Sequence, residues 1–127
     1  MVFTNAGLKE VKKWLAGHTI GQVHEIVLGE SGTADLETDT ALGSIVGTTS
    51  KAFSSVTETD YTVGYEHLLS TGEGNGFDFR ELGFMCYTAG TSLTDTVLFG
   101  RHTYPVINKT ESEEMQTTIT IKVDNEV

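Results

Sequence analysis

The order of apolar and polar positions predicts one helix at the start of the chain and strands after it. Over residues 5–16 the apolar side chains recur at helical spacing, which indicates an amphipathic helix with one face toward a core. Thr4 is suited to cap its first turn, and Gly17 can end it in the left-handed conformation. The expected apolar face comprises Leu8, Val11 and Leu15, with Trp14 beside it.

After residue 17 the pattern changes to the two-residue period of strands. The clearest segments are Tyr61–Leu69 and Met115–Val123, in which apolar and polar side chains alternate. We expect Pro105 to end the strand before it, because proline cannot donate a ladder hydrogen bond. Further strands are expected at Gln22–Leu28, Lys51–Thr57, Phe77–Tyr87 and Thr96–Tyr104.

Length and composition favour one mainly β domain covering residues 1–127. The chain holds 20 threonines, which favour strands, and 14 glycines, which mark turns and bulges. Residues 29–50 are small and polar and predict an extended connecting arm, while residues 51–123 form the β module. We therefore expect an N-terminal helix over about residues 5–16, followed by a small antiparallel β-sandwich or barrel-like sheet.

The charge balance restricts the partners of this chain. A formal net charge of -10 repels phosphate backbones and anionic lipid, so neither nucleic acid nor a membrane surface is an expected partner. Residues 1–17 are charged and amphipathic, unlike a secretory signal, and no segment is apolar for long enough to cross a bilayer. Cys86 is the one cysteine, so an intrachain disulfide is impossible.

The sequence offers no catalytic constellation, and we expect neither an enzyme nor a bound cofactor. Cys86 lies in an apolar stretch, where a buried inert thiol is favoured over a nucleophile. The glycine-rich segment Gly72–Gly76 lacks the context of a phosphate-binding loop and predicts a flexible hairpin. The four histidines are scattered without zinc-site spacing: His18, His24, His67 and His102.

One acidic strip is a weak candidate for a metal site. Asp35, Glu37 and Asp39 alternate along the connecting arm and are able to meet a divalent cation together with water. They lack the spacing and the glycine of a calcium-binding loop, so a solvated acidic strip is the favoured interpretation.

Charged residues within apolar surroundings are candidates for subunit contact. Arg80 and Glu81 interrupt an apolar strand, so at least one charge lies close to the core and needs a partner. Arg80 either bridges Glu81 or Asp78 within the fold, or pairs with an acidic group of a neighbouring subunit. Long irregular segments are commonly functional, so the arm is our first choice for intersubunit contact. The candidate contact residues are Trp14, Leu36, Asp39, Leu42, Arg80 and Glu81.

Within the arm, Asp39 and Leu42 allow two interpretations. In the first, Leu42 is a buried anchor and Asp39 caps a local turn of the same chain. In the second, the segment around them is an arm laid over a neighbouring subunit.

Four segments, in this order, resemble a family of small virion proteins of tailed bacterial and archaeal viruses, which includes tail-fibre, baseplate and appendage proteins. They contain the helix FTNAGLKEVKKWLAG, the strand end and Asp-Thr-Ala-Leu stretch IVLGESGTADLETDTALGS, the strand FDFRELGFM and the closing LFGRHTYPVINKTESEEMQTTITIKV. No fibrous shaft or receptor-binding tip follows the closing strand, which favours an adaptor, a plug or a surface decoration. The segments are Phe3–Gly17, Ile26–Ser44, Phe77–Met85 and Leu98–Val123.

The resemblance implies a structural protein located in the virion and assembled in the host cytoplasm. Its expected partners are further copies of itself, in a symmetric homo-oligomer such as a trimer, and other virion proteins. The expected place is the tail, the baseplate or a fibre attachment. The alternative is a turret or decoration protein on the capsid, and a carbohydrate-binding module is the third interpretation. The acidity is compatible with a halophilic host, because high salt screens repulsion between copies.

Overall fold

Eight strands in two sheets and one helix form the described part of the chain. The computed structural model describes residues 1–18, 21–88 and 95–123. In chain order the elements are β1 (Val2–Phe3), α1 (Asn5–Leu15), β2 (Val23–Gly29), β3 (Ile45–Ala52), β4 (Ser55–Glu58), β5 (Thr62–Leu69), β6 (Asp78–Tyr87), β7 (Thr96–Asn108) and β8 (Met115–Lys122).

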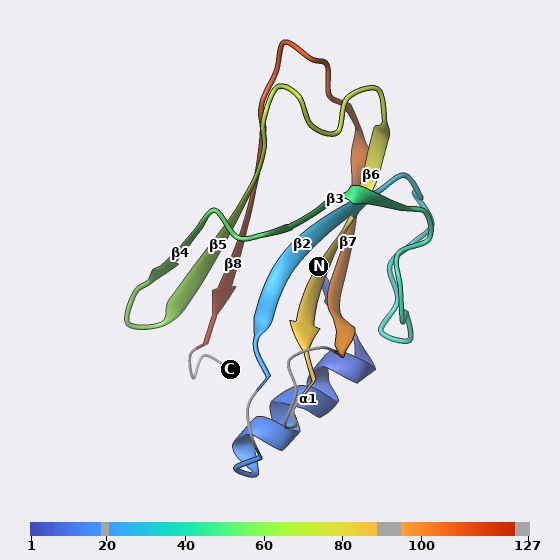
Figure 1. Cartoon of the computed structure of the whole chain (residues 1–127). Helices are drawn as coiled ribbons and strands as arrows, with labels where there is room; N and C mark the ends of the chain where they lie inside the picture. The colour runs from blue at the N-terminus through green and yellow to red at the C-terminus, as the bar shows by residue number, and fades with distance from the viewer. Residues whose placement is uncertain (19–20, 89–94, 124–127) are drawn as a thin grey trace.

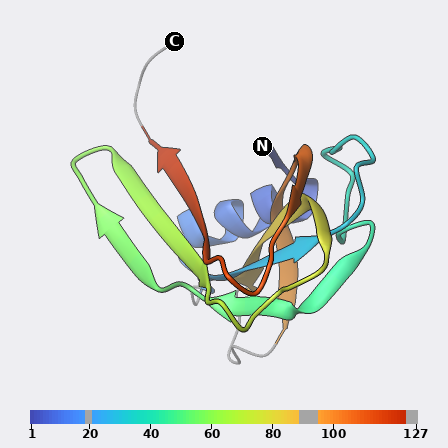
Figure 2. The same ribbon diagram turned by 90° about the horizontal axis from the view of Figure 1, so that it is seen from above.

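The strands form two antiparallel sheets that diverge from each other. Sheet A has the order β1-β7-β6-β2-β3, and sheet B has the order β4-β5-β8. Figures 1 and 2 show the sheets as the two arms of an open V, with α1 lying along sheet A. The expected mainly β fold, with one N-terminal helix before antiparallel strands, is confirmed. The sheets are not closed into a barrel, so the architecture is sandwich-like.

The core between the sheets is centred on the ring of Phe84, a fully buried residue of β6. This ring contacts Tyr65 of β5, Phe53 and Phe99, with ring centroids 5.0, 5.8 and 5.8 Å away. Such tilted and edge-on contacts add to the stabilisation from apolar burial. The remaining buried members of this cluster are Ile26, Leu28, Val46, Leu69, Phe79, Leu82, Cys86 and Ile119.

His67 joins the two sheets by a polar contact inside this core. It lies on β5, is fully buried, and its Nε2 is 2.7 Å from the carbonyl oxygen of Thr49 on β3. Burial lowers the pKa of His67, which favours the neutral ring with its Nε2–H donating to that carbonyl.

The helix docks with only part of the face that its apolar pattern predicts: Val11 and Trp14 pack against the core, but Leu8 and Leu15 do not. Its buried residues are Gly7 and Glu10, whereas Leu8 is 52% and Leu15 is 86% exposed. A Cβ atom added at Gly7 would lie 2.7 Å from the carbonyl oxygen of Phe99, so the close approach to β7 requires glycine. This contact sets the rotation of the helix and turns the two leucines outward.

Both ends of α1 follow the prediction. The hydroxyl oxygen of Thr4 accepts a hydrogen bond from the Gly7 N–H at 3.0 Å, and the same hydroxyl donates to the carbonyl of Leu98. Gly17 adopts a φ of 85°, the left-handed conformation expected after a helix. The helix ends at Leu15, with Ala16 as its C-cap.

Two strand boundaries differ from the prediction. Residues 45–50, expected in the arm, belong to β3 together with Lys51 and Ala52. In this strand the Thr49 hydroxyl accepts a hydrogen bond from the Leu28 N–H at 2.8 Å, at the point where the β2–β3 register shifts. Pro105 does not end β7, which continues to Asn108. The β6–β7 register shifts between Phe79 and Glu81, so Pro105 lies where the residues of the two strands are not paired one to one.

The glycine-rich segment Gly72–Gly76 is not a hairpin connection, because β5 belongs to sheet B and β6 to sheet A. Beside it, the buried ammonium group of Lys109 lies 2.7 Å from the Asn75 side-chain oxygen. The segment therefore links the two sheets at the end where the V is joined.

We expect Gly7→Ala to destabilise the protein by about 1–3 kcal/mol, because the new methyl group overlaps the β7 backbone. In a helix without this contact, the same change would stabilise by about 1 kcal/mol. Gly47→Ala is the matched control, since nothing lies within 4 Å of a Cβ atom there. Urea unfolding of both variants measures the difference, and a stabilised Gly7→Ala variant would contradict the docking contact.

Candidate functional site

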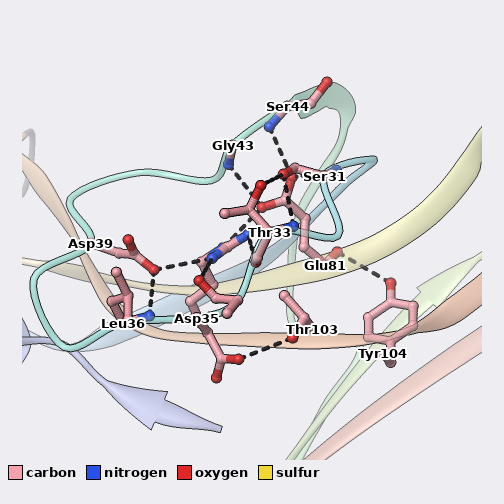
Figure 3. Close-up of polar contacts among 12 residues, drawn as sticks. Ser31, Thr33, Asp35, Leu36, Asp39, Gly43, Ser44, Glu81, Thr103 and Tyr104 are labelled. Carbon is pink, nitrogen blue, oxygen red and sulfur yellow. Dashed lines mark hydrogen bonds and ion pairs between the residues drawn. The ribbon is translucent and has the colours of Figure 1, made fainter.

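One buried carboxylate holds the connecting arm against sheet A. Glu81 of β6 is fully buried, and its Oε2 accepts hydrogen bonds from the N–H groups of Ser31, at 2.9 Å, and Ser44, at 2.8 Å. Its Oε1 accepts from the Gly43 N–H at 2.8 Å. Figure 3 shows both ends of the segment converging on this carboxylate. We refer to residues 31–44 as the arm loop.

Arg101 of β7 binds the same carboxylate from the other side. Its Nε donates to Glu81 Oε1 at 3.0 Å, and its side chain is 3% exposed. Its Nη1 donates to Asp39 Oδ2 at 3.1 Å and to the carbonyl of Ala34 at 3.2 Å. Its Nη2 donates to the carbonyl of Thr33 at 2.9 Å. The guanidinium group therefore fastens the middle of the arm loop, and Glu81 fastens its ends.

The electrostatics of this pair favour two charged groups. Burial alone would raise the pKa of Glu81, but three backbone N–H donors and Arg101 hold it below its usual value. The Tyr104 hydroxyl donates to the backbone carbonyl of Glu81 at 3.2 Å, and burial followed by the Glu81 charge raises the pKa of Tyr104 to about 12. A fully partnered carboxylate of this kind has a structural role.

The structure places Arg80 and Glu81 in different surroundings. The Arg80 side chain is partly exposed, lies 4.0 Å from the Asp78 carboxylate and donates to the Glu30 carbonyl at 3.4 Å. The charge drawn into the core is that of Glu81. Sequence reasoning missed its partner Arg101; the available signal was an arginine directly after the apolar run Leu98-Phe99-Gly100.

The three carboxylates of the acidic strip do not form one cluster. Asp35 Oδ1 accepts from the Thr103 hydroxyl at 3.0 Å, whereas Asp39 pairs with Arg101 and accepts from the Leu36 N–H at 2.8 Å. Within residues 1–18, 21–88 and 95–123, no group of three or more His, Cys, Asp or Glu side chains is arranged to hold a metal ion.

The arm loop makes its polar contacts within its own chain. The Leu42 side chain covers β6, where it would be 3.0 Å from a Cβ atom added at Gly83. A contact between the arm loop and another subunit can use only its outer side, on which Leu36 is 55% exposed.

An apolar hollow of about 400 Å³ opens between α1 and sheet B, and we call it the inter-sheet cleft. Trp14 forms part of its floor: the indole stacks on Phe99 with a centroid distance of 6.0 Å. At its rim Leu8 is 52% and Val123 is 70% exposed. Sequence reasoning assigned Leu8 to the core and so missed this surface. The lining residues are Phe3, Leu8, Val11, Trp14, Val23, Val63, Tyr65, Phe99, Ile121, Lys122 and Val123.

A second hollow of about 630 Å³, lined in part by aromatic rings, lies at the other side of Tyr65. Phe53 and Tyr87 line it, and the His24 ring stacks on Tyr87 with a centroid distance of 3.8 Å. Among the described residues, the buried Nε2 of His24 has no hydrogen-bond partner, and burial lowers the pKa of this histidine. Gln22 and Glu25 add polar groups, so the hollow combines flat rings with a few hydrogen-bonding groups.

Cys86 does not contribute a nucleophile to either hollow. It is fully buried, and burial raises the pKa of its thiol to about 12, so the thiolate is scarce at neutral pH. The two hollows thus offer surfaces for binding, and the inter-sheet cleft offers mainly apolar ones.

We expect Glu81→Gln to lower the free energy of unfolding by about 3–5 kcal/mol, because it removes the buried charge that pairs with Arg101 and leaves the partly exposed Asp39 as its counter-charge. Glu73→Gln is the matched control. Glu73 pairs with Lys51 at 2.8 Å, but on the surface, so we expect this variant to lower the free energy of unfolding much less. Urea unfolding of the two variants tests this difference. Equal losses would show that the buried pair does not hold the fold.

Among the described residues, no helix is both long and apolar enough to cross a membrane. Searches of protein-family models, of curated proteins and of solved structures gave no match to this chain.

Proposed function

We propose that this protein is a structural subunit of a virus particle and acts by assembling with further copies of itself and with other particle proteins. The observation that carries this proposal is the uncovered apolar surface around the inter-sheet cleft. On α1, Leu8 is 52% exposed at the cleft rim; directly after β8, Val123 is 70% exposed and lines the same cleft. A folded chain that leaves such side chains together on its surface has a surface suited to a partner.

The energetics favour an apolar interface over a charged one. Burial of apolar surface contributes roughly 25 cal/mol per Å², and the cleft supplies apolar area from both α1 and sheet B. A net charge of -10 opposes the approach of identical copies, and salt weakens this repulsion. Assembly through the cleft is therefore expected to strengthen as the salt concentration rises.

The location in a virus particle rests on the four ordered sequence segments that resemble small virion proteins of tailed viruses. The proposed position is the tail, the baseplate or a fibre attachment, in a symmetric oligomer. A turret or decoration protein on the capsid has the same structural requirement, a β module with an exposed contact surface. A reconstruction of the particle distinguishes the two, because density for this chain on the shell symmetry axes would exclude the tail position.

A carbohydrate-binding module is the second candidate function, and the second hollow is the observation that favours it. The rings of Phe53, Tyr65 and Tyr87 meet there beside His24 and Glu25, and aromatic faces with nearby polar groups suit a sugar ring. Titration with a panel of neutral oligosaccharides tests it. Binding that Tyr87→Ala abolishes would support this function, and the absence of binding to the panel would count against it.

We expect Leu8→Glu to weaken self-association at least tenfold, because it places a charge on the apolar rim of the cleft. Leu36→Glu is the matched control, since Leu36 has a similar exposed fraction, 55% against 52%, but lies on the arm loop. Sedimentation at about 1 M salt, where charges are screened within about 3 Å, measures both variants. A wild-type chain that stays monomeric at high concentration and high salt would contradict self-assembly.

A further inference from the structure

Strand β8 is an uncovered edge of sheet B. All eight of its residues, Met115–Lys122, pair with β5 in an unbroken register. In the part of the chain that the structure describes, no strand lies on its other side. The outward N–H and C=O groups of such a strand form a template for pairing with another chain.

The other edge strands carry more features that discourage pairing than β8 does. β1 has two residues, β4 has four and ends at Glu58, and β3 contains a register shift against β2. By contrast, residues 115–122 pair without a register shift and contain no Pro, Gly, Asp or Glu, although the chain as a whole has 18 acidic residues. Short length, bulges, proline and charge are the usual protection of edges, and in β8 the charge is confined to Lys122, its last residue.

We propose that β8 pairs antiparallel with β8 of a second copy, about a two-fold axis at Thr118, to give one continuous six-stranded sheet. This inference rests on the proposed function, because it specifies one contact by which copies assemble. An isologous contact of this kind uses the same surface on both subunits.

The alternation of side chains along β8 restricts the register. Met115, Thr117, Ile119 and Ile121 share the inner face of sheet B, since Ile119 is buried while Thr118 and Thr120 are exposed. With Thr118 opposite itself, Met115 faces Ile121 and Thr117 faces Ile119 on the inner side. If the register were shifted by one residue, the apolar side chains of one copy would lie opposite the outward-facing polar side chains of the other.

Several registers keep the inner faces of the two β8 strands on the same side. Opposite charges favour the one with Thr118 on the axis. With Thr118 on the axis, Glu114 of each copy, the residue directly before β8, lies opposite Lys122 of the other. A shift by two residues in either direction separates both pairs, so that Lys122 faces Gln116 or Ser112 instead. Opposite charges placed directly across two strands stabilise the pairing.

The proposed contact is continuous with the inter-sheet cleft. Ile121 of β8 and Val123, which follows it, line the cleft together with Phe3 and Leu8. A strand added at β8 extends the apolar wall that these residues form. The contact therefore buries cleft surface as well as the edge, and stable interfaces bury roughly 1,200–2,000 Å² in total.

A cysteine on the axis tests the register directly. In the full chain, Thr118→Cys is expected to form a disulfide-linked dimer under mild oxidation at about 1 M salt, since each new thiol meets its own copy. Thr120→Cys is the matched control: it lies on the same face but opposite Gln116, and we expect at least tenfold slower cross-linking. Cys86 does not compete, because it is fully buried. Cross-linking of both variants at the same rate would overturn the register.

Charge reversal tests the contact by a second route. Glu114→Lys and Lys122→Glu, each alone, place like charges opposite each other and are expected to weaken the dimer about five- to tenfold. The double variant restores opposite charges and is expected to recover the wild-type dissociation constant. Thermal unfolding of each variant checks that the chain remains folded. A double variant as weak as the single ones would overturn the pairing of these residues.

The failure of this inference and the failure of the proposed function give different results. An oligomeric wild-type chain in which Thr118→Cys does not cross-link would exclude β8 pairing and leave assembly through another surface. A wild-type chain that is monomeric at high salt and high concentration would overturn both.

Discussion

The buried ion pair between Glu81 and Arg101 is the constraint on which the rest of sheet A depends. A carboxylate and a guanidinium group are tolerated in a core only when their hydrogen bonds are made. Here the two strands supply the central charges, and the arm loop supplies the remaining partners, through three N–H groups, two carbonyls and the Asp39 carboxylate. The pair thus ties β6, β7 and a 14-residue loop, residues 31–44, into one unit.

Sheet B is held by other contacts, and this difference affects the surface of the molecule. Between the sheets, the polar contact of His67 with Thr49 and the rings around Phe84 hold the joined side of the V. Toward α1 the sheets separate, since Gly7 brings the helix onto β7 and away from sheet B. The inter-sheet cleft is therefore a consequence of how the helix docks.

The features that could be predicted from the sequence are those determined by residues close to one another along the chain. The alternation in Tyr61–Leu69 and Met115–Val123 located β5 and β8, and the helix ends at Thr4 and Gly17 follow from local backbone chemistry. The strand around Ile45–Ala52 escaped prediction because its threonine and serine residues resemble a loop, whereas Thr49 is buried at a register shift.

The candidate site was less predictable, because its contacts join distant parts of the chain. Glu81 and Arg101 meet only through the β6–β7 register, which sequence spacing does not reveal. Leu8 is exposed because the neighbouring Gly7 packs against the backbone of Phe99, which is more than ninety residues away in the sequence. This contact turns the side of the helix that carries Leu8 away from the core. Apolar periodicity identified the helix and the core contacts of Val11 and Trp14, but not the exposure of Leu8 and Leu15.

The pairing of β5 with β8 has a consequence for the order in which the protein forms. The end of β5, Leu69, and the start of β8, Met115, are 46 residues apart in sequence, and every strand of sheet A is synthesised before β8. Until β8 leaves the ribosome, sheet B is a two-stranded ribbon of β4 and β5, which is marginally stable in water. Of the two sheets, sheet B is thus the second to be completed during synthesis. A chain that ends before β8 would lack both the third strand of sheet B and the edge that this strand forms.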